Sequence, residues 1–178
     1  HHPNIDFYQG LGTFVDNTTV EVNGEKLTAD KIFIAVGTRP SIPPIPGLAA
    51  TPYWTSREAL RPEYKPRKLL VIGGGYIATE LGPVYGALGS EVEFIVRSGL
   101  VSAEDGEIRD EFTAAFTERY NVHLGMAIQE VHYEKGVYFV KTIDANGKVH
   151  QLHGDALLVA TGIRPNTDTL ALENTDIT

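Results

Sequence analysis

The apolar residues of this chain fall into short continuous runs, each followed by a polar or glycine-rich stretch. Continuous apolar runs rich in β-branched residues are typical of strands that are buried on both faces of a sheet. Two runs fit this description, KIFIAV at 31–36 and ALLVAT at 156–161. Three further strands are expected from KLLVIG, EVEFIVR and NVHLGM, at 68–73, 91–97 and 121–126.

The stretches between these strands predict two helices and a meander. The first helix follows the glycines at 73–75 and extends to about Leu88, although Pro83 is expected to kink or loosen it. The second helix spans Glu107–Tyr120 and is predicted to bury one stripe of residues at helical spacing. These residues are Ile108, Phe112, Ala115 and Phe116. A β-meander is expected over 128–153, so the alternation of elements indicates an α/β domain.

The chain also contains an internal repeat. VNGEKLTADKIFIAVGTRPSIP at 22–43 resembles ANGKVHQLHGDALLVATGIRPNT at 145–167. Each copy has an Asn-Gly pair, which favours a tight hairpin turn, then an acidic residue, an apolar run, a turn glycine and Arg-Pro. Only the second copy is preceded by a series of predicted strands and helices, which starts at Leu69. We therefore expect the chain to start partway through a larger protein, whose N-terminal part would complete the first copy.

The stretch between the two copies, residues 39–66, contains seven prolines. Proline fixes φ and interrupts helices and sheets, so this stretch is predicted to be an ordered but extended linker. A short helix is expected at Ser56–Leu60, with Ser56 or Thr55 as its N-cap.

Composition excludes several classes of partner. The formal net charge of the 178 residues is −8 and the basic residues are scattered, which argues against nucleic-acid and anionic-membrane partners. No apolar run approaches the roughly 20 residues of a membrane span. The chain has no cysteine, so it has neither a disulfide nor a thiol nucleophile. No metal site is predicted from the six histidines, and a cytoplasmic location is expected.

The glycine-rich stretch VIGGGYIATE at 71–80 carries the clearest chemical signal. Gly73, Gly75 and Ala78 fit a G-x-G-x-x-A pattern between a predicted strand and a predicted helix. In that setting Gly73 permits the tight turn, Gly75 allows the backbone to approach a pyrophosphate, and Ala78 keeps the helix close to the strand. The stretch therefore predicts a dinucleotide site.

The end of the next strand favours NADPH over NADH. NAD-binding domains place an acidic residue there for the adenosine ribose, whereas this strand ends in Arg97-Ser98. An Arg and a hydroxyl suit a 2′-phosphate. Glu91 and Glu93 lie at the beginning of the strand, and Arg109 is expected on the exposed face of the following helix.

Several ordered motifs together resemble the pyridine nucleotide-disulfide oxidoreductase family, which includes glutathione, mycothione and mercuric reductases and dihydrolipoamide dehydrogenase. These motifs are GTFVDNTTVEVNG, ADKIFIAVGTRPSIPPIPG, VIGGGYIATELG and LLVATGIRPNTDTLALENTDI. The resemblance implies a Rossmann-like βαβ dinucleotide-binding domain with a three-stranded meander, flanked by part of a flavin domain. It also implies electron flow from NAD(P)H to FAD and on to a disulfide or related substrate.

The resemblance assigns roles to individual residues. Tyr76 matches the aromatic that covers the flavin face, and Glu80 matches a carboxylate near the nicotinamide, although the helix dipole alone would also favour Glu80. These two are the expected catalytic residues. The residues expected to bind cofactors are Gly73, Gly74, Gly75, Tyr76, Ile77, Ala78, Glu80, Arg97, Ser98, Gly162 and Gly37.

The sequence departs from the family pattern at two positions. Several NADPH-dependent members carry a second Arg where this chain has Ala103, and the first copy has Val36 where Thr is usual. The family's flavin-binding glycine turn, cysteine pair and C-terminal interface domain have no counterpart in these 178 residues. We therefore expect this chain alone to have negligible reductase turnover, and the whole protein to be a homodimer formed through that C-terminal domain.

We accordingly assign residues 1–48 to a partial flavin domain, 49–66 to a linker, 67–162 to the NAD(P)-binding domain and 163–178 to a segment returning to the flavin domain. Two alternatives stay open. One is an NADH-dependent relative, such as dihydrolipoamide dehydrogenase or an NADH oxidase, and the other is a nucleotide-binding module without catalytic activity.

Overall fold

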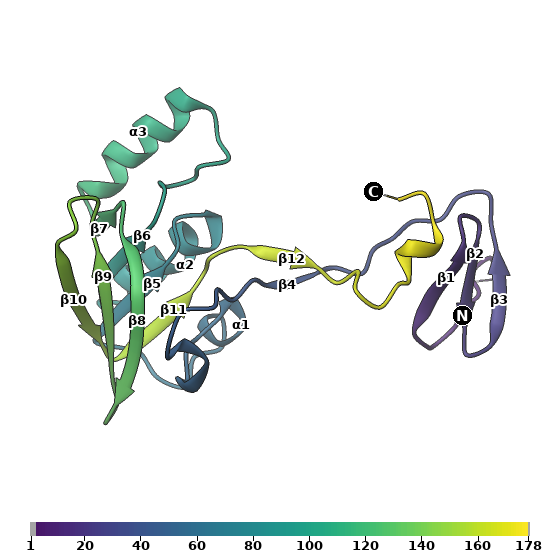
Figure 1. The fold of residues 1–178 in the computed structure, drawn as a ribbon, viewed down its shortest axis with the longest axis horizontal. Coiled ribbons are helices and arrows are strands. Elements are labelled where there is room, and N and C mark those ends of the chain that lie inside the picture. Colours follow the sequence, from purple (N-terminus) through teal and green to yellow (C-terminus); the bar gives the residue numbers. More distant parts are fainter. Residues whose placement is uncertain (1–2, 178) are drawn as a thin grey trace. The chain divides into compact units, whose positions relative to one another are not determined.

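A computed structural model describes residues 3–177 of the chain (Figure 1). By its internal contacts the chain divides into two compact units. The larger unit is Pro40–Ile163, and the smaller unit combines the residues up to Arg39 with those from Arg164 onward. The predicted boundaries at 48/49 and 66/67 therefore do not coincide with the division between units, because the proline-rich stretch lies within the larger one.

A four-stranded parallel sheet forms the centre of the larger unit, in the order β11-β5-β6-β7. Strand β5 (Lys68–Ile72) lies between β11 (Ala156–Val159) and β6 (Glu91–Val96), and β7 (Asn121–Leu124) pairs with β6. Strands β11, β5 and β6 are almost wholly buried, which agrees with their continuous apolar sequences.

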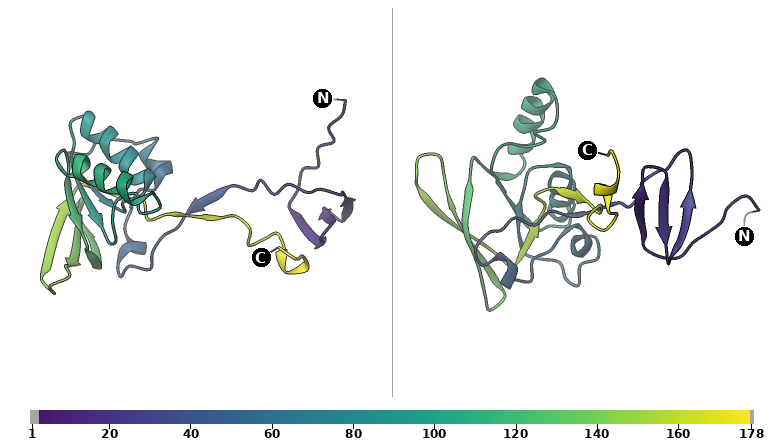
Figure 2. Two further views of the ribbon diagram at one scale, coloured as in Figure 1. Left: turned by 90° about the horizontal axis from the view of Figure 1, so that it is seen from above. Right: turned by 45° about the vertical axis from the view of Figure 1, so that its right-hand side comes forward.

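The sheet is covered on both faces (Figure 2). Helices α2 (Tyr76–Ala87) and α3 (Gly106–Thr117) contribute side chains to the apolar cluster on one face. The antiparallel meander contributes to the cluster on the other face. Its strands are β8 (Ala127–Glu134), β9 (Val137–Ile143) and β10 (Val149–Gly154). The predicted α/β fold with a three-stranded meander is thereby confirmed.

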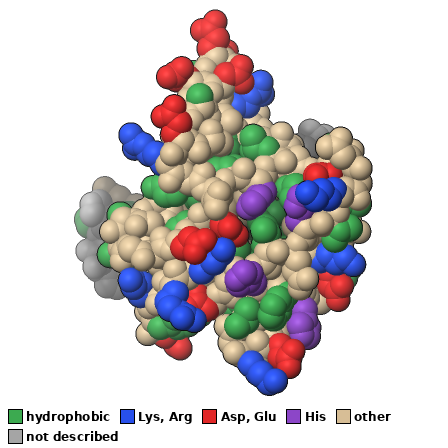
Figure 3. All heavy atoms as spheres, turned by 90° about the vertical axis from the view of Figure 1, so that its left-hand side faces the viewer, with side chains coloured by type: hydrophobic (Ala, Val, Ile, Leu, Met, Phe, Trp, Pro, Cys, Tyr) green, Lys and Arg blue, Asp and Glu red, His purple; other side chains and the backbone are tan. Residues whose placement is uncertain are grey.

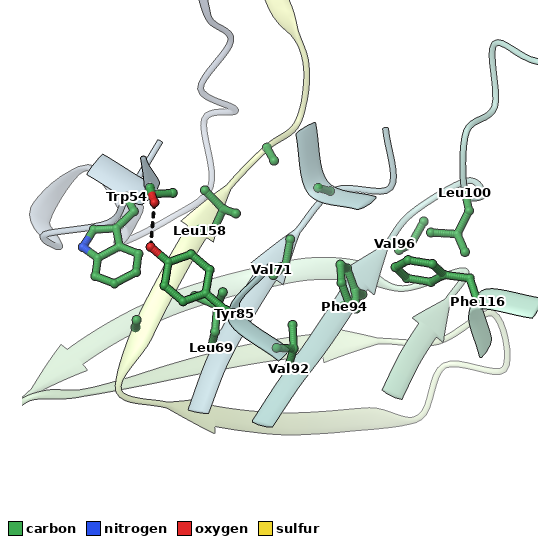
Figure 4. Packing of buried hydrophobic residues seen from close by; sticks show 14 of the residues in the cluster. Trp54, Leu69, Val71, Tyr85, Val92, Phe94, Val96, Leu100, Phe116 and Leu158 are labelled. Atoms are coloured by element: carbon green, nitrogen blue, oxygen red, sulfur yellow. Dashed lines mark hydrogen bonds between the residues drawn. The ribbon is translucent and has the colours of Figure 1, made fainter. Parts of the chain in front are cut away.

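The alternation of side chains along β5 explains the two clusters. Leu69 and Val71 belong to the cluster on the helix side, whereas Leu70 and Ile72 belong to the cluster on the meander side. Figure 4 shows the helix-side cluster, in which Phe94 of β6 packs against Phe116 of α3. Each apolar strand thus supplies two separate cores.

The two helices differ in part from expectation. Helix α2 is continuous across Pro83 and ends at Ala87. Helix α3 buries Phe116 and partly buries Phe112, but Ile108 is 57% exposed and Ala115 is also exposed. The predicted four-residue stripe is therefore wrong at those two positions. The apolar contacts lie along the later turns of the helix, where Phe112 and Phe116 stack on each other.

The proline-rich stretch is folded onto the larger unit. It contains the 3₁₀ turn η1 (Leu48–Ala50) and the helix α1 (Ser56–Ala59), whose N-cap is Thr55 in a reciprocal capping box with Glu58. Leu48 and Trp54 are buried. The backbone of Trp54 forms a parallel bridge with Leu158, so this stretch continues the sheet beside β11.

The smaller unit contains the antiparallel sheet β1-β2-β3, formed by β1 (Gly12–Asp16), β2 (Thr19–Val22) and β3 (Glu25–Thr28). The C-terminal segment docks on β1 near the 3₁₀ turn η2 (Leu172–Asn174). There the Phe14 N–H donates to the Leu170 carbonyl, and the Asn174 side chain donates to the Phe14 carbonyl. Two segments distant in sequence therefore build one small unit.

The predicted buried strand at 31–36 is not formed. No residue of this run belongs to a strand, and Phe33 is 89% exposed. Ile34 and Val36 are also exposed. A strand needs a neighbour that supplies ladder hydrogen bonds, and within residues 3–177 this run pairs with none. The corresponding run of the second copy is β11, which has β5 as its partner.

Two short strands occupy the points where the chain passes between the units. Strands β4 (Thr38–Pro40) and β12 (Ile163–Pro165) pair with each other as a two-stranded ribbon. Neither carries a buried residue. Among the described residues, no helix is long and apolar enough to cross a membrane.

Candidate functional site

The glycine turn between β5 and α2 can accept no side chain at its first position. Gly73 has φ +126°, and a Cβ added there would lie 2.7 Å from the carbonyl carbon of Ala160. At Gly74 an added Cβ would lie 2.8 Å from the Gly99 carbonyl oxygen. Both glycines are therefore required by the close approach of backbone segments.

Gly75 differs from its two neighbours because the space beside it is open. An added Cβ would meet no atom within 4 Å, and Gly75 is the N-cap of α2 without a side-chain capping bond. The first N–H groups of α2 are thus left available to an acceptor at this point. Behind the turn, Ala78 is fully buried in the helix-side cluster, which brings α2 close to the sheet.

A cavity of 710 Å³ lies at the carboxyl ends of β11, β5 and β6. The glycine turn forms its middle, the residues after β6 form one side, and the residues after β11 form the other. It is lined by Ser41, Pro43, Ile45, Ile72, Gly73, Gly74, Gly75, Tyr76, Ile77, Ile95, Val96, Arg97, Ser98, Gly99, Ser102, Met126, Ala127, Ile128, Ala160, Thr161, Gly162 and Ile163. The volume is that of a typical ligand pocket.

Arg97 is the one charged residue among the described residues that line this cavity. It directly follows β6, together with Ser98, and its guanidinium forms no ion pair within residues 3–177. Within residues 3–177 no carboxylate lines the cavity. The cavity therefore offers a positive charge and hydroxyl groups to a ligand, and no group that would repel an anion.

The two carboxylates of β6 lie at the opposite end of the strand, where they contact Lys68. The Lys68 ammonium is 2.8 Å from Glu91 and 3.2 Å from Glu93. Burial lowers the pKa of Lys68, but the hydrogen bonds to the two glutamates and their negative charges together raise it by more, so the net shift of the pKa is upward. Arg109 lies on α3 near Asp110 and does not line the cavity.

The two residues expected to be catalytic lie on one face of α2 but differ in their relation to the cavity. Tyr76 lines it and is 53% exposed. Glu80 follows one turn later, is exposed and does not line it. Ile77 lines the cavity beside the glycine turn.

The two turn glycines that follow the repeated apolar runs lie in different units. Gly162 has φ +123° and lines the cavity of the larger unit. Gly37 has φ +68° and belongs to the smaller unit, where its carbonyl accepts the N–H of Asn166 at 3.0 Å. The structure therefore brings together every expected cofactor-binding residue except Glu80, Gly37 and Ala78, the last of which supports the turn from behind.

The cavity residues outside the predicted set include Thr161, which follows β11, and three groups on other segments. Ser102 lines the cavity. It directly precedes Ala103, which stands where several NADPH-dependent members of the family carry a second Arg. Met126, Ala127 and Ile128 follow β7, and the rule that carboxyl ends of parallel strands meet at one edge could have identified them. The wall formed by Ser41, Pro43 and Ile45 has no local sequence signal.

No group of three or more His, Asp or Glu side chains within residues 3–177 is arranged to hold a metal ion. Histidine side chains are visible on the face of the molecule shown in Figure 3, among charged side chains. On the outer surface of the meander His132 lies beside Glu134, with Nε2 3.8 Å from the carboxylate, and its ring stacks on Phe139.

The comparisons with known proteins cover the whole chain. Residues 1–178 match the family model described as pyridine nucleotide-disulphide oxidoreductase. Mercuric reductase from Shigella flexneri is 43% identical over 186 residues, covering 99% of this chain and 32% of that protein. Glutathione reductase from Nostoc sp. is 36% identical over 179 residues, covering 97% of this chain and 37% of that protein.

A solved structure of a flavoprotein disulfide reductase is also similar to this chain. The HOCl-induced flavoprotein disulfide reductase RclA from Escherichia coli superposes with a TM-score of 0.78 and 30% sequence identity. The match covers 99% of this chain and 40% of that one. The chain therefore spans about a third of the length of the curated relatives it matches.

Proposed function

Since this chain belongs to the pyridine nucleotide-disulphide oxidoreductase family, we propose that its larger unit, Pro40–Ile163, binds NADPH in the 710 Å³ cavity. In the whole protein the bound NADPH would supply a hydride to FAD, and electrons would continue to a disulfide or related substrate. The matched relatives are named as reductases, which supports the proposal that the whole protein is an enzyme of this class.

The glycine turn fits a pyrophosphate. Gly75 leaves open space at the N-terminus of α2. At Gly73 and Gly74 an added side chain would meet backbone atoms, so the turn is formed by glycines alone. Backbone N–H groups directed at this space would donate to phosphate oxygens, and the helix dipole favours their negative charge. These features support a dinucleotide without deciding between NADPH and NADH.

The charge of the cavity lining is the observation that carries the choice of NADPH. Of the described residues that line the cavity, Arg97 is the one with a charge, Ser98 and Ser102 add hydroxyls, and none has a carboxylate that could accept hydrogen bonds from a ribose 2′-OH. A guanidinium binds a phosphate monoester through short charge-assisted hydrogen bonds. We assign Arg97 and Ser98 to the 2′-phosphate of the adenosine ribose.

Calorimetric titration of the chain with NADPH and with NADH tests this assignment. We expect tighter binding of NADPH, and Arg97→Gln should weaken it about tenfold to 100-fold, the effect of losing a hydrogen bond to a charged group. Binding of NADH should change little. Arg109→Gln is the matched control, because Arg109 is a partly exposed arginine outside the cavity.

Two results would contradict the proposal in different ways. Equal affinities for NADPH and NADH, both unaffected by Arg97→Gln, would refute the 2′-phosphate assignment and favour the NADH-dependent alternative. Binding of neither nucleotide by a folded chain would refute the nucleotide site itself. A whole protein that is purified without flavin would favour the non-catalytic module.

Tyr76 and Glu80 are proposed to act where the nicotinamide meets the flavin. Tyr76 lines the cavity and is half exposed, so its ring can cover an adjacent group and turn aside when the nicotinamide enters. Glu80 lies one turn further along the same exposed face of α2. In the whole protein, Glu80→Gln should slow reduction of the flavin by NADPH in rapid mixing while NADPH binding stays the same; an unchanged rate would remove Glu80 from this role.

The remaining expectations concern the chain by itself and the whole protein. We propose that this chain alone oxidises NADPH with disulfides at a negligible rate, because its 178 residues contain no cysteine and no counterpart of the family's flavin-binding glycine turn. Measurable turnover without flavin would contradict this. The homodimer and the cytoplasmic location stay predictions.

A further inference from the structure

We propose that the hydroxyl of Thr161 is a positioning group for the dinucleotide, because it fixes residues 41–46 as the cavity wall on the nicotinamide side. This inference rests on the proposed binding of NADPH in the same cavity. Thr161 and the wall both belong to the larger unit.

The wall is held at both of its ends by hydrogen bonds. At its start the Ser41 N–H donates to the Gly162 carbonyl at 2.9 Å, and the Thr161 hydroxyl donates to the Ser41 carbonyl at 2.6 Å. At its end the Val131 N–H donates to the Pro46 carbonyl at 2.9 Å. Ser41 is thus bound through both its N–H and its carbonyl, and the carbonyl bond depends on a single side chain.

The chain between these two ends is stiff and faces the cavity. Pro43, Pro44 and Pro46 fix φ at three of its six positions. Pro43 and Ile45 line the cavity, and Ile45 also packs against the meander-side core. In a stiff segment a shift at one end is passed along its length. The loss of the Thr161 bond would leave the Ser41 N–H as the hydrogen bond of this residue, so the start of the wall would shift and carry Pro43 and Ile45 with it.

The internal repeat shows that the hydroxyl is not needed to form the turn. In the first copy Val36 occupies the position of Thr161, and its side chain has no hydrogen-bond donor. Nevertheless the equivalent backbone bond forms, from the Asn166 N–H to the Gly37 carbonyl at 3.0 Å. The turn glycines Gly37 and Gly162 both have positive φ. The Thr161 hydroxyl therefore adds a bond to the wall that the turn itself does not require.

The order of the strands assigns this wall to one half of the ligand. Arg97 follows β6 and Thr161 follows β11, and β5 with the glycine turn lies between these two strands. A dinucleotide with its pyrophosphate at the turn extends to both sides. If its 2′-phosphate lies at Arg97, its nicotinamide lies at Thr161.

The test compares NADPH with 2′,5′-ADP, which contains the adenosine half alone. We expect Thr161→Val to raise the Kd of NADPH about threefold to tenfold, the effect of one neutral hydrogen bond, and to leave the Kd of 2′,5′-ADP within about twofold. Thr161→Ser keeps the hydroxyl and should bind NADPH like the original chain. Hydrogen exchange should show a faster Ser41 amide in Thr161→Val only.

Fluorescence of Trp54, the one tryptophan of the chain and a buried residue of the larger unit, checks that each variant is folded. Equal NADPH affinity of Thr161→Val and the original chain would overturn the inference. Equal loss of NADPH and 2′,5′-ADP would also overturn it, because a general structural defect would then explain both. If the original chain binds neither ligand, the proposed function fails together with this inference. If Arg97→Gln weakens NADPH binding and Thr161→Val does not, the proposed function stands and this inference fails.

Discussion

A Cβ added to Gly82 would lie 2.7 Å from Cε1 of Phe94, so α2 rests directly on the ring of a fully buried phenylalanine of β6. The contact is possible only without a side chain at position 82. It brings the helix close to the sheet one turn after the buried Ala78, and it thereby helps to hold the N-terminus of α2 at the glycine turn.

Gly82→Ala is therefore expected to destabilise the larger unit. Overpacking a close-packed core costs about 1–3 kcal/mol, which exceeds the roughly 1 kcal/mol that alanine gains over glycine in helix propensity. Urea unfolding followed by Trp54 fluorescence measures the change. Gly106→Ala in α3 is the matched control, since its added Cβ would meet only the end of Arg109, at 3.9 Å. A Gly82→Ala variant as stable as this control would refute the close contact.

Asp155 joins the start of β5 to the start of β11. Its carboxylate accepts the N–H of Lys68 at 2.7 Å and the N–H of Arg67 at 3.0 Å. Burial raises the pKa of Asp155, but the hydrogen bonds to its carboxylate, these two among them, together lower it by more, and the net shift is downward. Because the folded-state pKa lies below the unfolded value, the stabilisation is complete above the unfolded pKa and is lost as pH falls through the folded one.

Asp155→Asn should consequently lower the free energy of unfolding by about 1–2 kcal/mol at neutral pH, since an amide replaces a charged acceptor. The difference between the two proteins should shrink as pH is lowered through the acidic range, below the ordinary pKa of aspartate. Unfolding by urea at a series of pH values measures this difference. A difference that stays constant with pH would show that the charge of Asp155 is not responsible.

The Tyr85 hydroxyl donates to the Ala59 carbonyl at 2.6 Å, drawn as a dashed line in Figure 4. Burial raises the pKa of Tyr85, so the phenol keeps its proton at all ordinary pH values. Tyr85→Phe removes the donor and leaves a carbonyl unpaired, which should cost about 1–2 kcal/mol of unfolding free energy. Tyr120→Phe is the control, because Tyr120 packs its ring on Phe116 against the same cluster and is only partly buried. Equal effects of the two substitutions would argue against the Tyr85 bond.

The exposed run at 31–36 should promote self-association of the chain. Phe33 is the most exposed of its apolar residues, and an extended apolar segment without a ladder partner can pair with a second molecule. Phe33→Ser should reduce association in sedimentation velocity at high concentration without loss of the folded signal. Phe14→Ala, at a buried position of the smaller unit, should instead unfold that unit. If Phe33→Ser destabilises the unit as Phe14→Ala does, Phe33 is buried in solution.

The parts of the fold that the sequence predicted correctly depend on neighbours along the chain. The strand β5, its glycine turn and helix α2 follow one another directly, and so the spacing of Gly73, Gly75 and Ala78 contained their geometry. The N-cap of α1 was narrowed to Ser56 or Thr55 for the same reason, and the structure has Thr55. The position of Arg97 and Ser98 at the end of a strand was predicted because that strand is itself visible in the sequence, and both residues directly follow β6 and line the cavity.

The parts that were wrong or missed depend on contacts between distant segments. The run at 31–36 has the composition of β11 but lacks a partner strand, which periodicity cannot reveal. Ile108 has the correct spacing for a buried stripe, yet the first turns of α3 lack an apolar surface to cover them. Ser41, Pro43 and Ile45 became cavity residues through bonds to Thr161, Gly162 and Val131, more than 80 positions away.

The bridge between Trp54 and Leu158 has a consequence for how the larger unit meets other molecules. An edge strand presents unpaired N–H and C=O groups on which a second chain can add a strand. On the β11 side, the Trp54 N–H donates to the Leu157 carbonyl, and the Trp54 carbonyl accepts the Val159 N–H. These two groups of β11 are therefore already hydrogen-bonded and cannot pair with a strand of another chain. Within residues 3–177 the central sheet therefore leaves its opposite edge, the four-residue strand β7, as the side open to strand addition.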